Sequence, residues 1–225
     1  MNLSGPRGNL LLILSGFFIT NAVVAELISS KLIQLGPFTT IVGILPWPLV
    51  FLATDVVNEF YGPKVVRRLS FITSALIGYA FFVVYGALEL PAAEGSPASD
   101  EVFRAAFGQS LTVIIGSITA FLLSQLLDVT VFWYIRKLTK ARYIWLRATG
   151  STLVSQLIDS YVVLGIGFYL PGTFTLDQYL AIGWDNYTLK ILVALGLTPF
   201  IYISHTWMKK YIGHIADEEQ APTSR

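Results

Sequence analysis

Long apolar runs without charge alternate with short charged segments along the whole chain. A helix needs about 20 apolar residues to cross a hydrocarbon core about 30 Å thick, and six runs approach or exceed that length. We therefore expect an all-α polytopic membrane protein, with six transmembrane helices forming one domain over residues 1–225. The expected spans are about 8–30, 37–57, 69–88, 108–135, 148–170 and 186–208.

The composition supports a lipid environment and excludes several functions. Of the 225 residues, 54% are hydrophobic and 13% are charged, whereas soluble domains carry about 25% charged residues. A net charge of +1 gives no reason to expect a nucleic-acid partner. The chain has no cysteine, and its two histidines, His205 and His214, both lie near the C-terminus. We therefore expect no thiol chemistry, no metal site and no cofactor.

The positions of the basic residues predict the orientation of the helices. Lysine and arginine are retained on the cytoplasmic side of a membrane. One set of loops and both ends of the chain carry most of these residues, whereas the loops at 89–104 and 171–185 hold one, Arg104. We therefore expect both termini in the cytoplasm. The basic residues of that side are Arg7, Lys64, Arg67, Arg68, Arg136, Lys137, Lys140, Arg142, Arg147, Lys209, Lys210 and Arg225.

Carboxylates occur inside three of the expected spans. A charge near the bilayer centre costs about 2.5–3.5 kcal/mol on insertion scales, so each one needs a reason to be there. With a rise of 1.5 Å per residue, Asp128 lies about 12 Å and Asp159 about 18 Å from the basic boundary, and Asp55 lies about 14 Å from it. These side chains are therefore expected in one layer within the membrane.

A short repeat joins amides to two of these carboxylates. Residues 124–128 read Ser-Gln-Leu-Leu-Asp, and residues 155–159 read Ser-Gln-Leu-Ile-Asp. Glutamine and aspartate three residues apart share a helix face, and the two helices run antiparallel. The plain interpretation is packing through hydrogen bonds between helices. The alternative, which we favour, is a small-molecule site, because carboxylates and amides beside aromatic rings suit a planar nitrogen heterocycle.

Two further charges have a structural interpretation. Lys190 and Glu26 are both expected near the outer interface, where Lys190 would snorkel, and we expect them to pair with each other. Pro46 and Pro48 are expected to kink the second span.

Several motifs together carry a resemblance to a known family. The stretch Thr-Asp-Val-Val-Asn-Glu-Phe-Tyr-Gly at 54–62, followed by basic residues, closely resembles the signature of bacterial queuosine precursor transporters, a vitamin-uptake-like family. The repeat at 124–128 with Val131 and Phe132, the stretch from Arg147 to the repeat at 155–159, and Thr-Pro-Phe-Ile-Tyr at 198–202 look like the same family. The resemblance covers nearly all of residues 21–202.

The resemblance implies a multi-pass transporter of the bacterial inner membrane, similar in architecture to the substrate-binding components of energy-coupling-factor transporters. Its substrate would be 7-cyano-7-deazaguanine or 7-aminomethyl-7-deazaguanine, salvaged for queuosine in tRNA. Asp159 or Asp128 would accept hydrogen bonds from the ring N–H and the exocyclic amine. A glutamine amide would donate a hydrogen bond to the carbonyl of the ligand. Of the candidate binding residues, the three from the signature would bind substrate, gate its path or stabilise the structure, and the tryptophans would stack on the ring. The candidates are Asp159, Gln156, Asp128, Gln125, Asp55, Asn58, Glu59, Trp47 and Trp133.

Three alternatives remain at this stage. The chain could be a binding subunit for another vitamin-like heterocycle that works with a separate ATP-driven module, since it contains no phosphate-binding glycine loop. An intramembrane aspartyl enzyme using Asp128 and Asp159 is more remote, and we expect no enzyme. A purely structural scaffold predicts that changes at Asp159 or Gln156 alter stability only.

Overall fold

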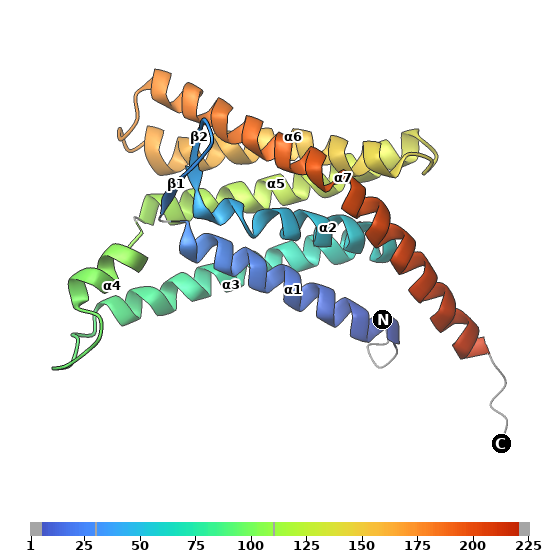
Figure 1. Ribbon diagram of the computed structural model, residues 1–225, viewed down its shortest axis with the longest axis horizontal. Helices are drawn as coiled ribbons and strands as arrows, with labels where there is room; N and C mark the ends of the chain where they lie inside the picture. The colour runs from blue at the N-terminus through green and yellow to red at the C-terminus, as the bar shows by residue number, and fades with distance from the viewer. Residues whose placement is uncertain (1–5, 30, 110, 221–225) are drawn as a thin grey trace.

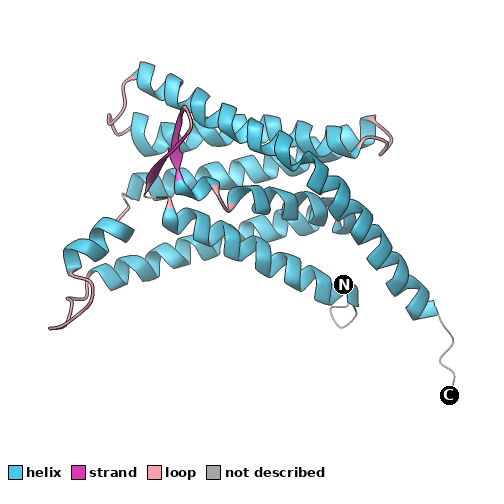
Figure 2. Ribbon diagram, in the orientation of Figure 1, coloured by secondary structure: helices cyan, strands magenta, loops and turns pink. Residues whose placement is uncertain are grey.

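The computed structural model describes residues 6–29, 31–109 and 111–220. Six helices in this part of the chain are long and apolar enough to cross a membrane, which confirms the all-α polytopic prediction. They run side by side along one axis (Figures 1 and 2). The six are α1 (Pro6–Ile28), α2 (Trp47–Tyr61), α3 (Pro63–Leu88), α5 (Leu111–Leu138), α6 (Ile144–Leu164) and α7 (Leu176–Gln220).

The six long helices pack in a closed ring. In ring order, α1 contacts α2, α2 contacts α7, α7 contacts α6, α6 contacts α5, α5 contacts α3 and α3 returns to α1. The short helix α4 (Asp100–Phe107) lies beyond the end of α3, outside the bundle (Figure 1). The backbones of α5 and α6 do not pack closely against the backbone of α2. Contacts from α2 to these two helices must therefore run through side chains that cross the interior of the ring.

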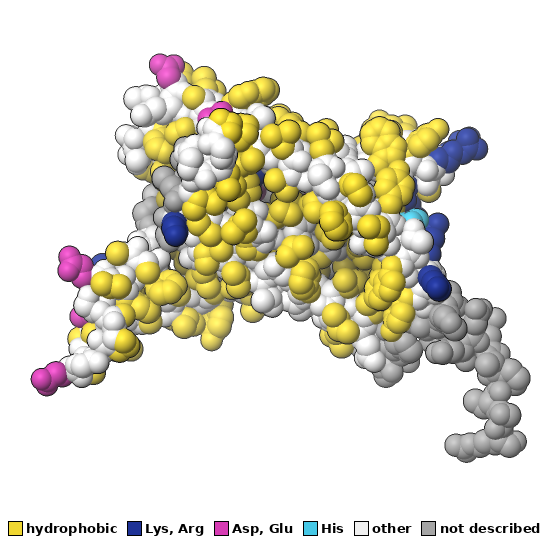
Figure 3. All heavy atoms as spheres, viewed as in Figure 1, with side chains coloured by type: hydrophobic (Ala, Val, Ile, Leu, Met, Phe, Trp, Pro, Cys, Tyr) yellow, Lys and Arg dark blue, Asp and Glu magenta, His cyan; other side chains and the backbone are white. Residues whose placement is uncertain are grey.

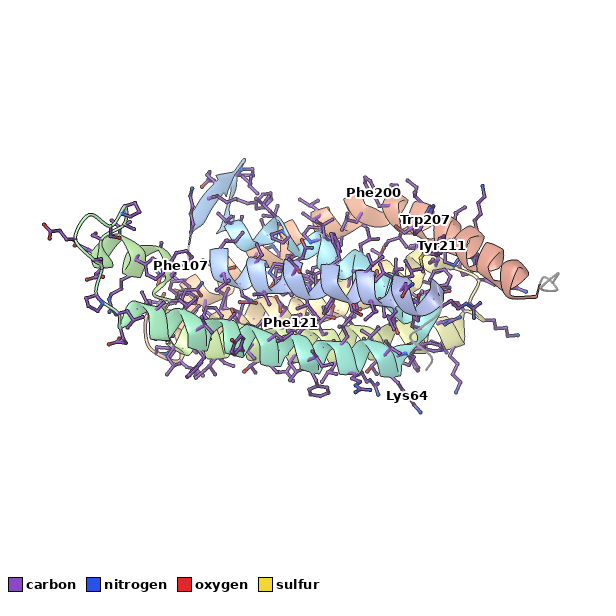
Figure 4. The ribbon with its side chains drawn as sticks, turned by 90° about the horizontal axis from the view of Figure 1, so that it is seen from below. Lys64, Phe107, Phe121, Phe200, Trp207 and Tyr211 are labelled. Atoms are coloured by element: carbon purple, nitrogen blue, oxygen red, sulfur yellow. The ribbon has the colours of Figure 1, made fainter. Side chains whose placement is uncertain are left out.

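Apolar side chains cover the outside of the ring, whereas many polar side chains lie inside it. Leu12, Phe71 and Phe82 are exposed, and yellow hydrophobic atoms dominate the middle of the surface in Figure 3. The aromatic core at the centre includes Phe18 and Phe121, and Figure 4 shows Phe121 inside the bundle. This distribution is expected when lipid is the solvent, because a polar group that faces hydrocarbon has no hydrogen-bond partner.

The second span differs from the prediction at its start. Residues 37–57 were expected to form one helix, but β1 (Leu32–Leu35) and β2 (Phe38–Ile41) form an antiparallel hairpin with Leu35 opposite Phe38. Gly36 has a positive φ of 58°, which the first turn position of a two-residue hairpin loop requires. The β-branched residues around this turn favour strands over helix.

The two prolines begin a helix instead of kinking one, so the predicted kink in the second span was wrong. After a 3₁₀ turn at Val42–Ile44, Pro46 caps α2 and Pro48 lies in its first turn. A proline lacks the N–H that has no helical partner at this end, so it fits there without loss. The helix then ends at Tyr61, where Gly62 with φ 86° and Pro63 separate α2 from α3, as predicted.

Four helices extend beyond the charged residues at which the sequence analysis placed the ends of the spans. Helix α3 begins at Pro63 instead of residue 69, α6 begins at Ile144 instead of 148, and α7 begins at Leu176 instead of 186. Helix α5 runs on to Leu138, and α6 continues into a π-helical turn, η2 (Gly165–Tyr169). Long charged side chains near a helix end reach the interface without ending the helix, so counting to the nearest charge shortens each span.

Charged residues separate to the two ends of the bundle. Basic side chains gather at the end where both termini lie, and most of the acidic side chains visible in Figure 3 lie at the other end. We call these the basic end and the hairpin end, since β1 and β2 lie at the latter. Arg225 lies outside the described residues, as does the side chain of His214.

Glycine allows close approach between α5 and the π-helical turn. A Cβ at Gly116 would lie 3.1 Å from the backbone nitrogen of Gly167 and 3.2 Å from the carbonyl oxygen of Val163. A larger side chain there would have to push backbone aside. By contrast, a Cβ at Gly86 of α3 would meet no atom within 4 Å.

We predict that Gly116→Leu destabilises the folded bundle by about 1–3 kcal/mol through overpacking. The matched change Gly86→Leu should leave stability unchanged or raise it slightly, since leucine is the better helix former. Thermal unfolding of both purified variants in detergent measures the difference. Equal melting temperatures for the two variants would contradict the close packing of α5 on η2.

Candidate functional site

The repeated sequences of α5 and α6 bond to each other reciprocally. Ser124 Oγ donates to Asp159 Oδ1 at 3.2 Å, and Ser155 Oγ donates to Asp128 Oδ1 at 3.2 Å. The two helices are antiparallel, and serine and aspartate lie four residues apart on one face of each. Each repeat therefore supplies a donor to the other's carboxylate. This arrangement holds Asp128 and Asp159 at two different levels inside the ring.

The amides of the repeats differ in their partners. Gln125 Oε1 lies 3.3 Å from the hydroxyl of Thr54, which joins α5 to α2 across the ring. Among the residues that the structure describes, Gln156 Oε1 has no hydrogen-bond partner, although Gln156 is only 2% exposed. Since an unpaired polar group costs more in hydrocarbon than in water, Gln156 retains unused capacity to bind.

A cavity at the hairpin end is lined by one of the two aspartates of the repeats. Its lining includes Glu26, Trp47, Asp159, Asn186 and Lys190. The ammonium of Lys190 forms an ion pair with Asp159, with Nζ 2.5 Å from Oδ2. Lys190 therefore pairs with Asp159, and the prediction that it pairs with Glu26 was wrong. The reason is the early start of α7, which puts Lys190 about 21 Å along the helix instead of near its end.

The space in this cavity is small. Its volume of about 30 Å³ would hold roughly two water molecules. A bicyclic ring needs more room than that. A ligand of that size could enter this cavity only if the surrounding helices moved apart.

A network of one carboxylate and three basic side chains lies at the basic end. The guanidinium of Arg147 donates to Glu59 through Nε (3.1 Å) and one terminal nitrogen (2.8 Å). Arg136 and His205 approach the same carboxylate, with nitrogen to oxygen distances of 3.8 Å and 3.6 Å. Arg147 is 2% exposed and also donates to the carbonyl of Ala141. Glu59 thus ties α2 to α5, α6 and α7.

Two further residues of the 54–62 signature, Asp55 and Asn58, lie on α2 between Glu59 and Thr54, and Thr54 bonds to Gln125 of the first repeat. Asn58 Oδ1 accepts from Trp133 Nε1 at 2.6 Å, and Arg136 lies over the ring of Trp133. Asp55 is buried, has one carboxylate oxygen without a partner, and borders two small cavities of about 10 Å³ each. The signature therefore builds a buried polar layer on the basic side of the repeats.

The nine predicted site residues thus do not share one site, but are spread over the hairpin end, the basic end and the interior of the ring. Asp159 and Trp47 border the cavity at the hairpin end, whereas Asp55 and Glu59 border cavities nearer the basic end. Asn58 and Trp133 belong to the hydrogen-bonded layer between α2 and α5. Gln125, Gln156 and Asp128 lie buried within the ring.

Sequence reasoning missed several residues of this site. Glu26, Lys190 and Asn186 border the cavity, and Arg147 and His205 complete the network around Glu59. The depth of Lys190 could have been found from the apolar residues that precede Asp185, which extend the helix backwards. Within the described chain, no group of three or more histidine, cysteine, aspartate or glutamate side chains is arranged to hold a metal ion.

Comparison with known proteins identifies the family. A family model described as "Putative vitamin uptake transporter" matches residues 41–204. A protein of Bacillus subtilis named "Probable queuosine precursor transporter" is 35% identical over 80% of this chain and 78% of its own length. The "Queuosine precursor transporter" of Escherichia coli is 29% identical over 70% of this chain and 69% of its own length.

A Haemophilus influenzae protein, also named "Probable queuosine precursor transporter", is 28% identical over 76% of this chain and 72% of its own length. No solved structure matches the chain. All three relatives are named as transporters and none as an enzyme. The family model covers most of the six-helix ring, including the 54–62 signature and both repeats, so this chain belongs to the vitamin uptake transporter family.

Proposed function

We propose that this protein imports a queuosine precursor across the bacterial inner membrane, with 7-cyano-7-deazaguanine or 7-aminomethyl-7-deazaguanine as substrate. The observation that carries this proposal is the cavity inside the ring, which is lined by Trp47 and by the partly buried Asp159–Lys190 pair. A flat heterocycle with ring N–H groups and a carbonyl suits such a mixture of aromatic, acidic and basic groups. The names of the three relatives support the same substrate.

The distribution of charge supports an orientation for this import. The basic end would face the cytoplasm, because lysine and arginine are retained there, and both termini lie at that end (Figure 1). The cavity beside Asp159 would then lie toward the outside of the cell. A substrate arriving from outside would meet this cavity before the layer formed by the 54–62 signature.

A second candidate is a binding subunit that works with a separate ATP-driven module. The chain carries no phosphate-binding glycine loop of its own. The intramembrane enzyme is set aside, because the family is one of transporters.

The proposed function predicts rescue of queuosine synthesis. Bacteria that can neither make the deazaguanine nor import it should regain queuosine in tRNA when they express this protein and receive 7-cyano-7-deazaguanine at low concentration. Queuosine in hydrolysed tRNA is measured by mass spectrometry. An empty vector is the control, and absence of queuosine despite normal protein in the membrane would contradict the function.

Neutralising the buried aspartates should stop uptake. Asp159→Asn leaves the partly buried Lys190 ammonium without its anion. Asp128→Asn replaces the charged acceptor of two hydroxyl groups of α6 by a neutral amide, whose NH₂ group then needs an acceptor of its own. We expect uptake to fall at least about 10-fold in each variant. Uptake of labelled substrate is compared at equal protein level in the membrane.

The double variant Asp159→Asn/Lys190→Met separates binding from packing. It removes both charges, so it should be more stable than Asp159→Asn alone. If Asp159 contacts the substrate, uptake stays low in this variant. Uptake restored to the wild-type rate would show that the pair only holds the helices together.

We also propose that the network around Glu59 keeps the basic end closed while substrate enters from the other end. Its bidentate pair with Arg147 joins α2 to α6 across the ring, where these helices lack close backbone contact. A gate of this kind must open for release, so its bonds must break and re-form in each cycle.

Glu59→Gln should lower stability by about 3–5 kcal/mol, because Arg147 would remain buried without a charged partner. Replacing both residues, Glu59→Gln/Arg147→Met, should recover much of that loss. Thermal unfolding in detergent measures stability, and uptake is measured in parallel. A double variant with wild-type uptake would remove the network from the transport cycle.

A further inference from the structure

The cavity at the hairpin end holds two carboxylates but only one ammonium group. Asp159 and Glu26 both line it, and Lys190 is bonded to Asp159. In the described part of the chain, no lysine, arginine or histidine lies within 4 Å of the Glu26 carboxylate as an ion pair. Glu26 is 4% exposed, and the Ser117 hydroxyl is its hydrogen-bonding neighbour. The cavity therefore contains one acidic group that lacks a cationic partner.

The two aspartates of the repeats already accept bonds within the protein. Asp159 accepts from Ser124 and pairs with Lys190, and Asp128 accepts from Ser155 and Thr152. A ligand at either one would compete with these bonds for acceptor positions. Because a carboxylate has about four acceptor positions, Glu26 keeps most of its capacity for a ligand.

We propose that Glu26 of α1 accepts the N–H edge of the substrate, an inference that rests on the proposed function. A deazaguanine carries a ring N–H beside an exocyclic amine, and one carboxylate can accept both in a bidentate pair. The sequence analysis assigned the carboxylate that accepts this edge to Asp159 or Asp128, and we assign it to Glu26 instead. Asp159 instead positions Lys190 across the same cavity.

Lys190 and Trp47 complete the recognition of a flat ring. An ammonium group has three donors, and Asp159 uses one of them, so Lys190 can also donate to a ligand carbonyl. Trp47 borders the cavity and is itself stacked on Phe51, which fixes the plane of its ring. Donor and acceptor edges of one ligand would thus meet opposite charges on separate helices, α7 and α1.

The position of Glu26 is held by the local fold. A Cβ on Gly43 would lie 2.8 Å from the carbonyl oxygen of Ala25, so the turn after the hairpin packs directly on the end of α1. Gln109 donates to the backbone carbonyl of Glu26 at 2.9 Å. These contacts fix the backbone that carries the carboxylate, which favours a preorganised site.

The test measures how strongly the protein prefers a ligand that has the exocyclic amine. Purified protein in detergent is titrated with 7-cyano-7-deazaguanine and with the same ring system lacking the 2-amino group, and Kd is measured for each by calorimetry. The wild-type protein should bind the complete ligand roughly 10- to 100-fold more tightly, since a site built for a hydrogen bond rejects a ligand that lacks it.

In Glu26→Gln, this preference should fall below about 3-fold. The amide keeps the size of the side chain but offers one acceptor and turns a donor toward the ligand's N–H. The ratio is taken on one protein sample, so partial loss of folded protein does not change it. Glu89→Gln is the matched control, because Glu89 is exposed just after the end of α3 and should keep the wild-type ratio.

Separate outcomes identify which idea fails. If the wild-type protein prefers the complete ligand and Glu26→Gln keeps that preference, the role of Glu26 is overturned while the proposed function stands. If the wild-type protein binds neither ligand, both are overturned. Should Glu26→Gln not fold, Glu26→Asp replaces it: the shorter acid should weaken binding but retain the preference, and an unchanged Kd would overturn the assignment.

Discussion

Polar contacts across the interior of a ring of helices are the interaction on which the rest of this structure depends. Neighbouring helices pack around the ring, but α2 reaches α5 and α6 through side chains, as in the Asn58–Trp133 and Glu59–Arg147 bonds. In hydrocarbon no water is available to form hydrogen bonds with an unpaired polar group. These bonds therefore fix how α2 is rotated and which of its faces points inward.

The same constraint makes the two ends of the bundle different. At the basic end the single carboxylate of Glu59 is surrounded by Arg136, Arg147 and His205, and its negative charge is fully compensated. At the hairpin end two carboxylates, Glu26 and Asp159, line a cavity with one ammonium group, that of Lys190, which pairs with Asp159. A transporter needs such an asymmetry, because its site must open to one side while the other stays sealed.

Sequence reasoning found the antiparallel repeats because their signal is local. Serine, glutamine and aspartate at fixed spacing share a helix face whatever surrounds the helix, and the structure bonds Ser124 to Asp159 and Ser155 to Asp128. The partner of Lys190 could not be found in this way. It depends on which helix lies opposite Lys190, and the spacing of the residues of α7 does not specify that neighbour.

The sequence by itself determined that this protein lies in a membrane, that six helices cross it and that acids and amides lie within them, because hydropathy and helix periodicity are properties of the chain. Only the tertiary structure decided which charges meet. Glu26 and Asp159 lie 133 positions apart, and their shared cavity exists because α1, α6 and α7 pack in one ring around the hairpin end. Pairing of buried charges follows that packing, since lipid offers no alternative partner.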